Sequence, residues 1–137
     1  MNRPGVLLDT GPLVALLSAA DANHDRARRA FAACAPPLRT CEAVIAEACF
    51  LMRKVHASGP AEVLALGARG VYELGFSLAQ HWREVEALLR KYASRPVSLA
   101  DASLIRLATI HQDARVLTFD SDFSIYRWDR NRKFDVL

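Results

Sequence analysis

The sequence predicts an α/β domain built around a mostly parallel sheet. Short apolar runs, such as those at 6–8 and 115–119, end in polar turn residues, and longer stretches with helical periodicity separate them. Parallel neighbours in a sheet need a crossover connection, which helices of this length provide. The chain has 137 residues, of which 52% are apolar and 24% charged. We therefore expect a single domain over residues 1–137 with a packed core.

The first half of the chain is expected to form two strands and three helices. Pro12 suits a first helical turn, because its missing N–H would have no partner there. Thr40 is expected to cap a helix, and Ser58-Gly59-Pro60 to end it. In order, we expect a strand over 6–8, a helix from 11, a helix from Asp21 or Asn23 to 33, a strand over 38–40 and a helix over 42–56.

The second half continues the alternation of strands and helices. Strand-forming side chains at Val71, Tyr72, Leu74 and Phe76 predict a strand region, and Ser98 can begin a helix. In order, we expect a helix over 62–69, a strand region over 70–78, helices over 79–92 and 98–111, and a strand over 115–119. Because a basic segment at 127–133 has aromatic residues interleaved, it is either a solvated turn or a contact surface for phosphates and bases.

Glu47 occupies a position where the helical pattern favours an apolar residue. The stripe Val44, Ala48, Leu51 and Val55 predicts one buried helix face, and position 47 falls within it. A carboxylate that faces a core must be paired or bound to a cation. The alternative is an edge position, from which Glu47 reaches solvent or an arginine.

Each of the other notable acids has an ordinary structural explanation when taken alone. Ser98-x-x-Asp101 fits a capping box, in which Asp101 begins a helix. Asp9, Asp120 and Asp122 directly follow predicted strands, where aspartates commonly form turns. Taken together, however, these acids are expected at the carboxyl ends of parallel strands and on the neighbouring helices. Ligands gather at that edge of an open sheet.

Converging carboxylates need a compensating positive charge. Two carboxylates about 4 Å apart repel by roughly 4 kcal/mol at an effective dielectric constant near 20. A set of oxygen ligands without His or Cys suits Mg²⁺ or Mn²⁺ rather than zinc. The chain contains no Gly-x-Ser-x-Gly or phosphate-binding loop motif, so nucleophilic catalysis by the protein is not indicated.

Four acidic motifs, in order along nearly the whole chain, resemble those of PIN domains, and of small stand-alone VapC-type toxins in particular. The motifs are Leu7–Ala15, Val44–Ala48, Leu99–Leu104 and Leu117–Phe123. This resemblance implies a three-layer α/β/α fold, an acidic pocket at the carboxyl edge of the sheet, and Mg²⁺- or Mn²⁺-dependent cleavage of RNA.

Matching positions give the site residues that the resemblance implies. Asp9, Glu47, Asp101 and Asp120 form the acidic, metal-binding set, and Thr118 helps to orient it. Asp122 is either a substitute for Asp120 or a supporting residue. The resemblance also implies an antitoxin protein partner and a homodimer. The candidates for the basic rim that approaches RNA are Arg39, Arg53, Lys54, Arg127, Arg130, Arg132 and Lys133.

Charge and cysteine content set the expected compartment and leave two rival functions open. The net charge of +3 permits a polyanionic partner without requiring one. Three cysteines without a Cys-x-x-Cys pair, and no apolar run near about 18 residues, favour a cytoplasmic protein without a membrane segment. The rivals are a Mg²⁺-dependent phosphotransfer domain of the phosphatase or receiver type, and a non-catalytic RNA- or protein-binding module whose acids only cap helices.

Overall fold

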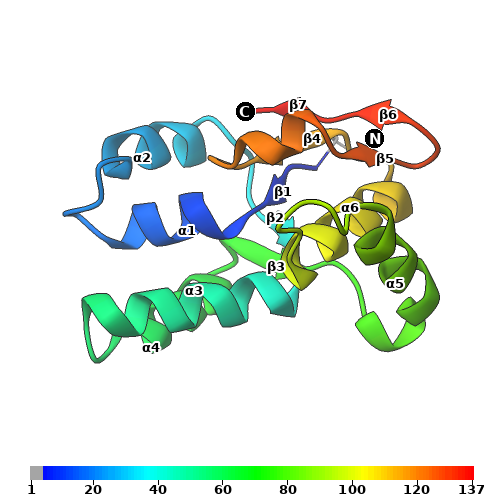
Figure 1. The fold of residues 1–137 in the computed structure, drawn as a ribbon. Helices are drawn as coiled ribbons and strands as arrows, with labels where there is room; N and C mark the ends of the chain where they lie inside the picture. The colour runs from blue at the N-terminus through cyan, green and yellow to red at the C-terminus, as the bar shows by residue number, and fades with distance from the viewer. Residues whose placement is uncertain (1–4) are drawn as a thin grey trace.

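A five-stranded parallel sheet forms the centre of the molecule (Figure 1). The computed structural model describes residues 5–137, so residues 1–4 of the expected domain lie outside it. The strand order is β3-β2-β1-β4-β7, and every neighbouring pair is parallel. The strands are β1 (Leu7–Leu8), β2 (Leu38–Thr40), β3 (Tyr72–Leu74), β4 (Arg115–Leu117) and β7 (Asp135–Val136).

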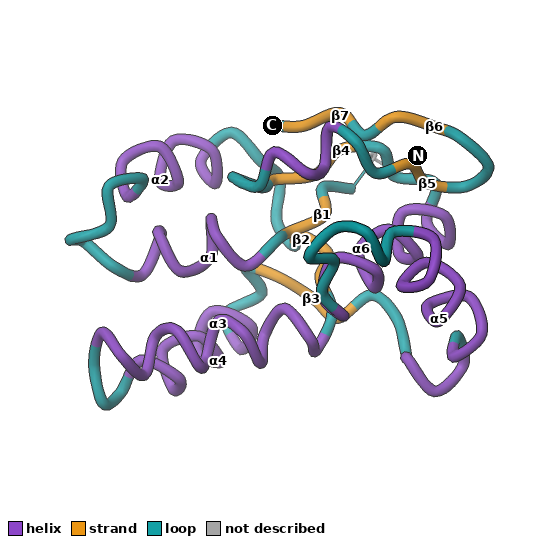
Figure 2. Tube along the Cα trace, in the orientation of Figure 1, coloured by secondary structure: helices purple, strands orange, loops and turns teal. Residues whose placement is uncertain are grey.

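Helices connect the strands, and Figure 2 shows their alternation along the chain. The α-helices are α1 (Thr10–Leu17), α2 (His24–Ala32), α3 (Glu42–Val55), α4 (Gly59–Ala68), α5 (Trp82–Lys91) and α6 (Leu99–His111). Two 3₁₀ helices, η1 (Leu78–Gln80) and η2 (Ser121–Ser124), and an antiparallel hairpin of β5 (Arg127–Trp128) and β6 (Arg132–Lys133) complete the elements. Within residues 5–137, no helix is long and apolar enough to cross a membrane.

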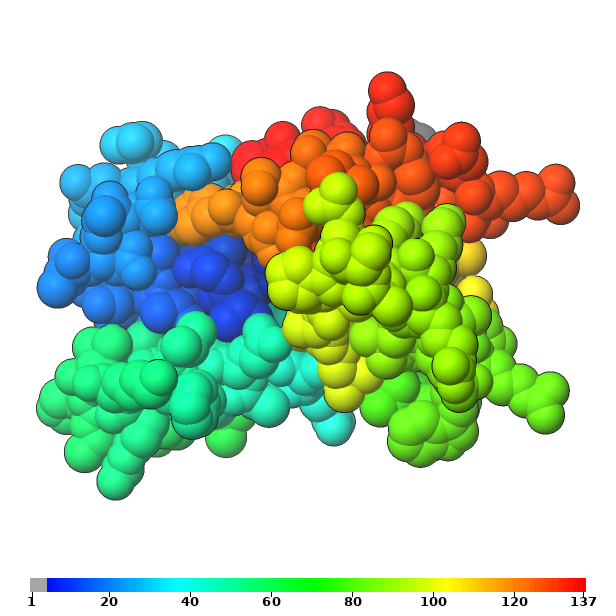
Figure 3. Space-filling model, in the orientation of Figure 1, coloured from blue at the N-terminus to red at the C-terminus, as the bar shows by residue number. Residues whose placement is uncertain are grey.

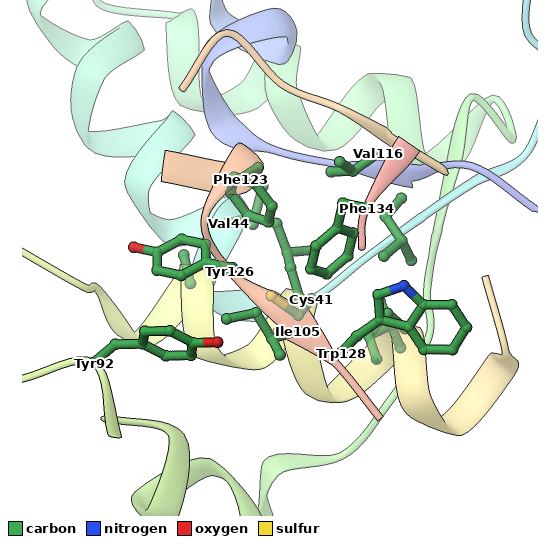
Figure 4. Packing of buried hydrophobic residues seen from close by; sticks show 14 residues of the cluster. Cys41, Val44, Tyr92, Ile105, Val116, Phe123, Tyr126, Trp128 and Phe134 are labelled. Carbon is green, nitrogen blue, oxygen red and sulfur yellow. The ribbon is translucent and has the colours of Figure 1, made fainter. Parts of the chain in front are cut away.

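Two apolar clusters lie on opposite faces of the sheet. Successive side chains of a strand point to opposite faces, so Leu7 belongs to one cluster and Leu8 to the other. The first cluster packs α6 against the sheet, and Figure 4 shows how the aromatic residues of the C-terminal segment close it. The second cluster holds residues of α1, α3 and α4. The predicted three-layer α/β/α arrangement is therefore confirmed.

The expected strand over 70–78 is shorter than predicted. Only Tyr72–Leu74 pairs with β2, and the chain then leaves the sheet at Gly75. A Cβ at Gly75 would lie 2.7 Å from Leu107 Cδ1, so α6 packs directly against a backbone that has no side chain there. The residues that follow form η1 instead of continuing the strand.

Three helix boundaries also differ from the sequence expectation. The helix expected to begin at 62 begins at Gly59, with Pro60 in its first turn, where proline is tolerated. The helix expected over 79–92 divides at His81, whose φ of −136° is not helical. Thr40 does not cap α3, because its hydroxyl donates to the carbonyl of Leu8 at 2.8 Å, and Cys41 takes the cap position without a side-chain bond.

The basic C-terminal segment is part of the packed structure. Tyr126 and Trp128 are fully buried, and the Trp128 indole N–H donates to the carbonyl of Lys133 at 3.1 Å. The guanidinium of Arg132 lies 4.2 Å from the centre of the Trp128 ring. These aromatic rings therefore cannot stack on bases, as one interpretation of the sequence expected. The strand β7 that follows was not predicted.

Burial on α6 predicts a large difference between two leucines of the same helix. Leu107 is fully buried, whereas Leu99 is 43% exposed. We expect Leu107→Ala to lower the free energy of unfolding by about 2–5 kcal/mol, because it removes apolar contacts and leaves a cavity. Leu99→Ala should change it by no more than about 0.5 kcal/mol. Urea denaturation measures both, and equal losses would contradict the core described here.

Candidate active site

A pocket of about 430 Å³ opens at the carboxyl edge of the sheet, where four separate segments meet. Figure 3 shows the face on which the blue, teal, yellow-green and orange segments come together. The lining residues are Asp9, Thr10, Gly11, Glu47, Leu51, Pro96, Ser98, Asp101, Phe119 and Asp120. The structure thus brings together the four acids that the sequence singled out first.

Asp9 is a buried carboxylate held by two hydrogen bonds. It follows β1 and caps α1, accepting from the backbone N–H of Thr10 at 2.8 Å with one oxygen. Its other oxygen accepts from the hydroxyl of Thr118 at 2.6 Å. Burial raises the pKa of Asp9 from 3.8 to about 6; these hydrogen bonds oppose the rise, and the charges of Asp101 and Asp120 add to it.

Asp101 serves as a helix cap and also lines the pocket. It forms a full capping box with Ser98, so the structural explanation from sequence holds. The same oxygen, Oδ2, accepts from the backbone N–H of Ser98 at 3.2 Å and from the hydroxyl of Tyr126 at 3.1 Å. Burial raises the pKa of Asp101; its hydrogen bonds oppose the rise, and the charges of Asp120 and Glu47 add to it. The cap and the pocket residue are therefore one side chain.

Glu47 does not face the core, so of the two sequence interpretations the edge position, from which it reaches solvent, is the correct one. The buried face of α3 consists of Val44, Ala48 and Met52, whereas Leu51 and Val55 are exposed. Glu47 is exposed to the pocket instead. The helix therefore turns its carboxylate toward solvent.

A neighbouring helix supplies the partner of Glu47. Its Oε2 accepts from the hydroxyl of Thr10 at 3.0 Å. The two arginines considered as partners have other contacts: Arg53 donates to the carbonyl of Ala57, and Arg106 lies 4.0 Å from Glu84. Glu47 is therefore tied to the first residue of α1, next to Asp9.

The turn after β4 separates Asp120 from Asp122. The hydroxyl of Thr118 accepts from the backbone N–H of Asp120 at 3.0 Å, while Asp120 Oδ1 accepts from the backbone N–H of Asp122 at 2.9 Å. Asp120 lines the pocket. Asp122 forms an ion pair with Arg95 at 3.2 Å and does not line it.

Sequence reasoning missed Thr10 and the contact of Tyr126 with Asp101. A signal for Thr10 was available, because the residue after a strand-ending aspartate lies at the same edge. No local pattern indicates Tyr126, whose ring is fixed by edge-to-face contacts with Phe123 and Tyr92. The seven candidates for the basic rim do not line the pocket. Arg39 instead pairs with Asp113 and Glu73 at the amino edge of the sheet.

The donor set of the pocket fits a hard divalent cation. All four acids offer carboxylate oxygens, which Mg²⁺ and Mn²⁺ prefer. Mutual repulsion among them contributes to the raised pKa values of Asp9 and Asp101. Within residues 5–137, however, no group of three or more His, Cys, Asp or Glu side chains is already arranged to hold a metal ion. The chemistry of the donor atoms therefore fits a hard cation, although the present arrangement of these described side chains does not form a coordination site.

The protein is of the α/β/α class, with a parallel sheet and an acidic pocket at the carboxyl edge of that sheet. Comparison of its sequence with models of known families identifies the family. Residues 6–129 match the family model of the PIN domain. The chain therefore belongs to the PIN domain family.

One solved structure shares the fold across nearly the whole chain. The crystal structure of Mycobacterium tuberculosis VapC20, described as a sarcin-ricin loop cleaving toxin, is similar with a TM-score of 0.81 and 24% sequence identity. The similarity covers 93% of this chain and 99% of that one. No curated protein sequence matches the chain.

The raised pKa of Asp9 predicts how stability depends on pH. The folded state binds the proton of Asp9 more tightly than the unfolded chain does, so the contribution of this group to stability is complete below about pH 4 and is lost as the pH rises through about 6. The shift of about two units corresponds to about 3 kcal/mol. In chelator, we expect Asp9→Asn to remove most of this fall, as measured by urea denaturation across that range. Parallel pH profiles for the two proteins would contradict the assignment.

The hydrogen bond from Tyr126 to Asp101 predicts a second stability difference. Tyr126→Phe keeps the ring but leaves Asp101 one donor short, so we expect a loss of about 1.5–3 kcal/mol, typical of a hydrogen bond to a charged group. Tyr92→Phe is the matched control, because its hydroxyl accepts from a neutral donor, the backbone N–H of Arg127, and the loss should be about 1 kcal/mol. If Tyr126→Phe left the free energy of unfolding unchanged, this hydrogen bond would not stabilise Asp101.

Proposed function

We propose that this PIN domain is a metal-dependent endoribonuclease that hydrolyses phosphodiester bonds in RNA, and that it is the toxin of a type II toxin–antitoxin pair. The observation that supports this most is the convergence of Asp9, Glu47, Asp101 and Asp120 on one pocket. The RNA-cleaving toxin that shares the fold supports RNA as the substrate.

The hydrogen bonds of the pocket prepare its carboxylates for an ion. A carboxylate oxygen has two acceptor positions, and each Asp9 oxygen accepts one hydrogen bond. In Asp101, Oδ2 accepts both hydrogen bonds, so Oδ1 is the oxygen that would bind a cation. We propose that Asp9, Asp101 and Asp120 hold Mg²⁺ or Mn²⁺ and that Glu47 completes the set. When bound, such an ion polarises the phosphate and lowers the pKa of water.

The surrounding residues determine the orientation of this set. Thr118 joins two of its members, because its hydroxyl donates to Asp9 and accepts from the N–H of Asp120. Thr10 holds Glu47 through Oε2, so Oε1 is the oxygen that can orient a water molecule toward a phosphate. Asp122 acts outside the set, as the partner of Arg95. Within the described pocket lining there is no Cys, His or Lys, in keeping with attack by water.

Exposed apolar residues on α3, α4 and β3 support a protein partner. Phe50 is 65% exposed, Leu64 is 58% exposed and Leu74 is 50% exposed. A cavity of about 670 Å³ between α3 and α4 is lined by residues that include Ile45, Leu64 and Leu74. Exposed apolar patches of this kind mark interaction sites. We propose that an antitoxin and a second copy of the chain, in a cytoplasmic homodimer, are the partners.

Cleavage of RNA by the purified protein tests the function. We expect cleavage with Mg²⁺ or Mn²⁺ and none with EDTA. Asp9→Asn and Asp101→Asn should each reduce the rate by more than about 100-fold, the upper limit for residues that only support a metal site. Asp135→Asn is the control, because Asp135 is exposed at the start of β7, does not line the pocket, and loses the same charge. Undiminished cleavage by either pocket variant, or in chelator, would overturn the proposal.

A further inference from the structure

The acidic pocket poses an electrostatic problem for a substrate made of phosphates. Four carboxylates line it, and RNA carries a negative charge on every nucleotide. In addition to a cation in the pocket, positive charges beside it favour the approach of a polyanion. Two arginines that sequence reasoning did not select, Arg26 and Arg95, occupy such positions.

Arg26 lies over an aromatic side chain of the pocket. Its guanidinium carbon is 4.4 Å from the centre of the Phe119 ring, which is within the range of a cation–π interaction. Phe119 lines the pocket and packs against the start of α1, where a Cβ at Gly11 would lie 3.7 Å from its ring. Arg26 itself is exposed, and within residues 5–137 no carboxylate forms an ion pair with it.

Arg95 is held on the other side of the same loop. Its guanidinium pairs with Asp122 at 3.2 Å, and its side chain is 35% exposed. The next residue, Pro96, lines the pocket. In Figure 1, α2 and the yellow-green segment before α6 lie on opposite sides of the orange loop after β4. The loop after β4 therefore contacts Arg26 through Phe119 and Arg95 through Asp122. Asp120, which lines the pocket, lies between these two loop residues in the sequence.

We propose that Arg26 and Arg95 form a phosphate clamp that lays an RNA strand across the Asp120 side of the pocket. Each arginine binds one phosphate that flanks the phosphate at the carboxylates. Guanidinium groups suit this task, because their planar donors match phosphate oxygens. The aromatic and carboxylate partners hold the two side chains in place before RNA arrives, which reduces the entropy lost on binding.

The clamp rests on the proposed ribonuclease function, and two separate measurements distinguish their failures. Cleavage of RNA by the wild-type protein tests the function. The clamp is tested by the salt dependence of binding to a fluorescein-labelled single-stranded RNA of mixed sequence, followed by fluorescence anisotropy. The binding protein carries Asp9→Asn so that the RNA stays intact. On single strands, each phosphate contact adds about 0.7 to the slope of log affinity against log salt.

We expect Arg26→Gln and Arg95→Gln each to reduce this slope by about 0.7. Over a fourfold increase in salt concentration, each variant should therefore lose about 2.6-fold less affinity than the protein without it. Arg26→Lys should keep the slope, because the charge remains. Arg28→Gln is the matched control, since Arg28 is exposed on the same helix and two residues away, and it should leave the slope unchanged. Asp122→Asn keeps an oxygen that can accept from Arg95 and hold it in place, but it removes the negative charge that neutralises Arg95, so it should tighten binding at low salt.

Unchanged slopes in Arg26→Gln and Arg95→Gln would overturn the clamp, and so would an equal loss in Arg28→Gln. If Arg95→Gln does not fold, Asp122→Asn tests the role of Arg95 instead. RNA binding by Asp122→Asn that is no tighter than binding by the Asp9→Asn protein alone would overturn that role. Absence of cleavage by the wild-type protein, with the slope pattern intact, would overturn the ribonuclease function alone.

Discussion

The burial of carboxylates in a pocket that they share with other carboxylates is the constraint on which the rest of this structure depends. Asp9 is almost completely buried, and Asp101 and Asp120 raise its pKa further. Hydrogen bonds from Thr10, Thr118, Ser98 and Tyr126 reduce the strain but supply no positive charge. A protein that keeps such an arrangement gives up stability at that point. In the proposed function, a bound divalent cation would offset this loss.

The fold holds these charges in place from both sides of the sheet. Asp9 and Thr118 directly follow neighbouring parallel strands, and the N–H of Asp9 donates to the carbonyl of Leu117. On one face, Tyr126 is packed in the aromatic cluster (Figure 4). Its hydroxyl donates to Asp101. On the other face, the packing of α1 against α3 brings Thr10 to Glu47. The apolar cores therefore position the polar site directly.

The sequence predicted most of the helices, four of the five sheet strands and the pocket acids, because these depend largely on local patterns. Strand-ending aspartates at a carboxyl edge follow from the parallel order, so Asp9 and Asp120 could be placed without coordinates. The direction in which Glu47 points could not be predicted, because it depends on how α3 packs against both apolar clusters. The two arginines of the proposed clamp were not selected from the sequence. Arg127 belongs to a basic stretch of sequence, but only tertiary packing shows that Arg26 lies over Phe119 and that Asp122 pairs with Arg95.

Calorimetric titration with Mn²⁺, in buffers of different ionisation enthalpy, tests most directly whether the carboxylates bind a cation as one set. Metal ligands must be deprotonated, so binding releases any proton that they hold. With the pKa of Asp9 near 6, binding should release about half a proton at pH 6 and almost none at pH 8. Absence of Mn²⁺ binding, or binding without proton release at pH 6, would contradict the account.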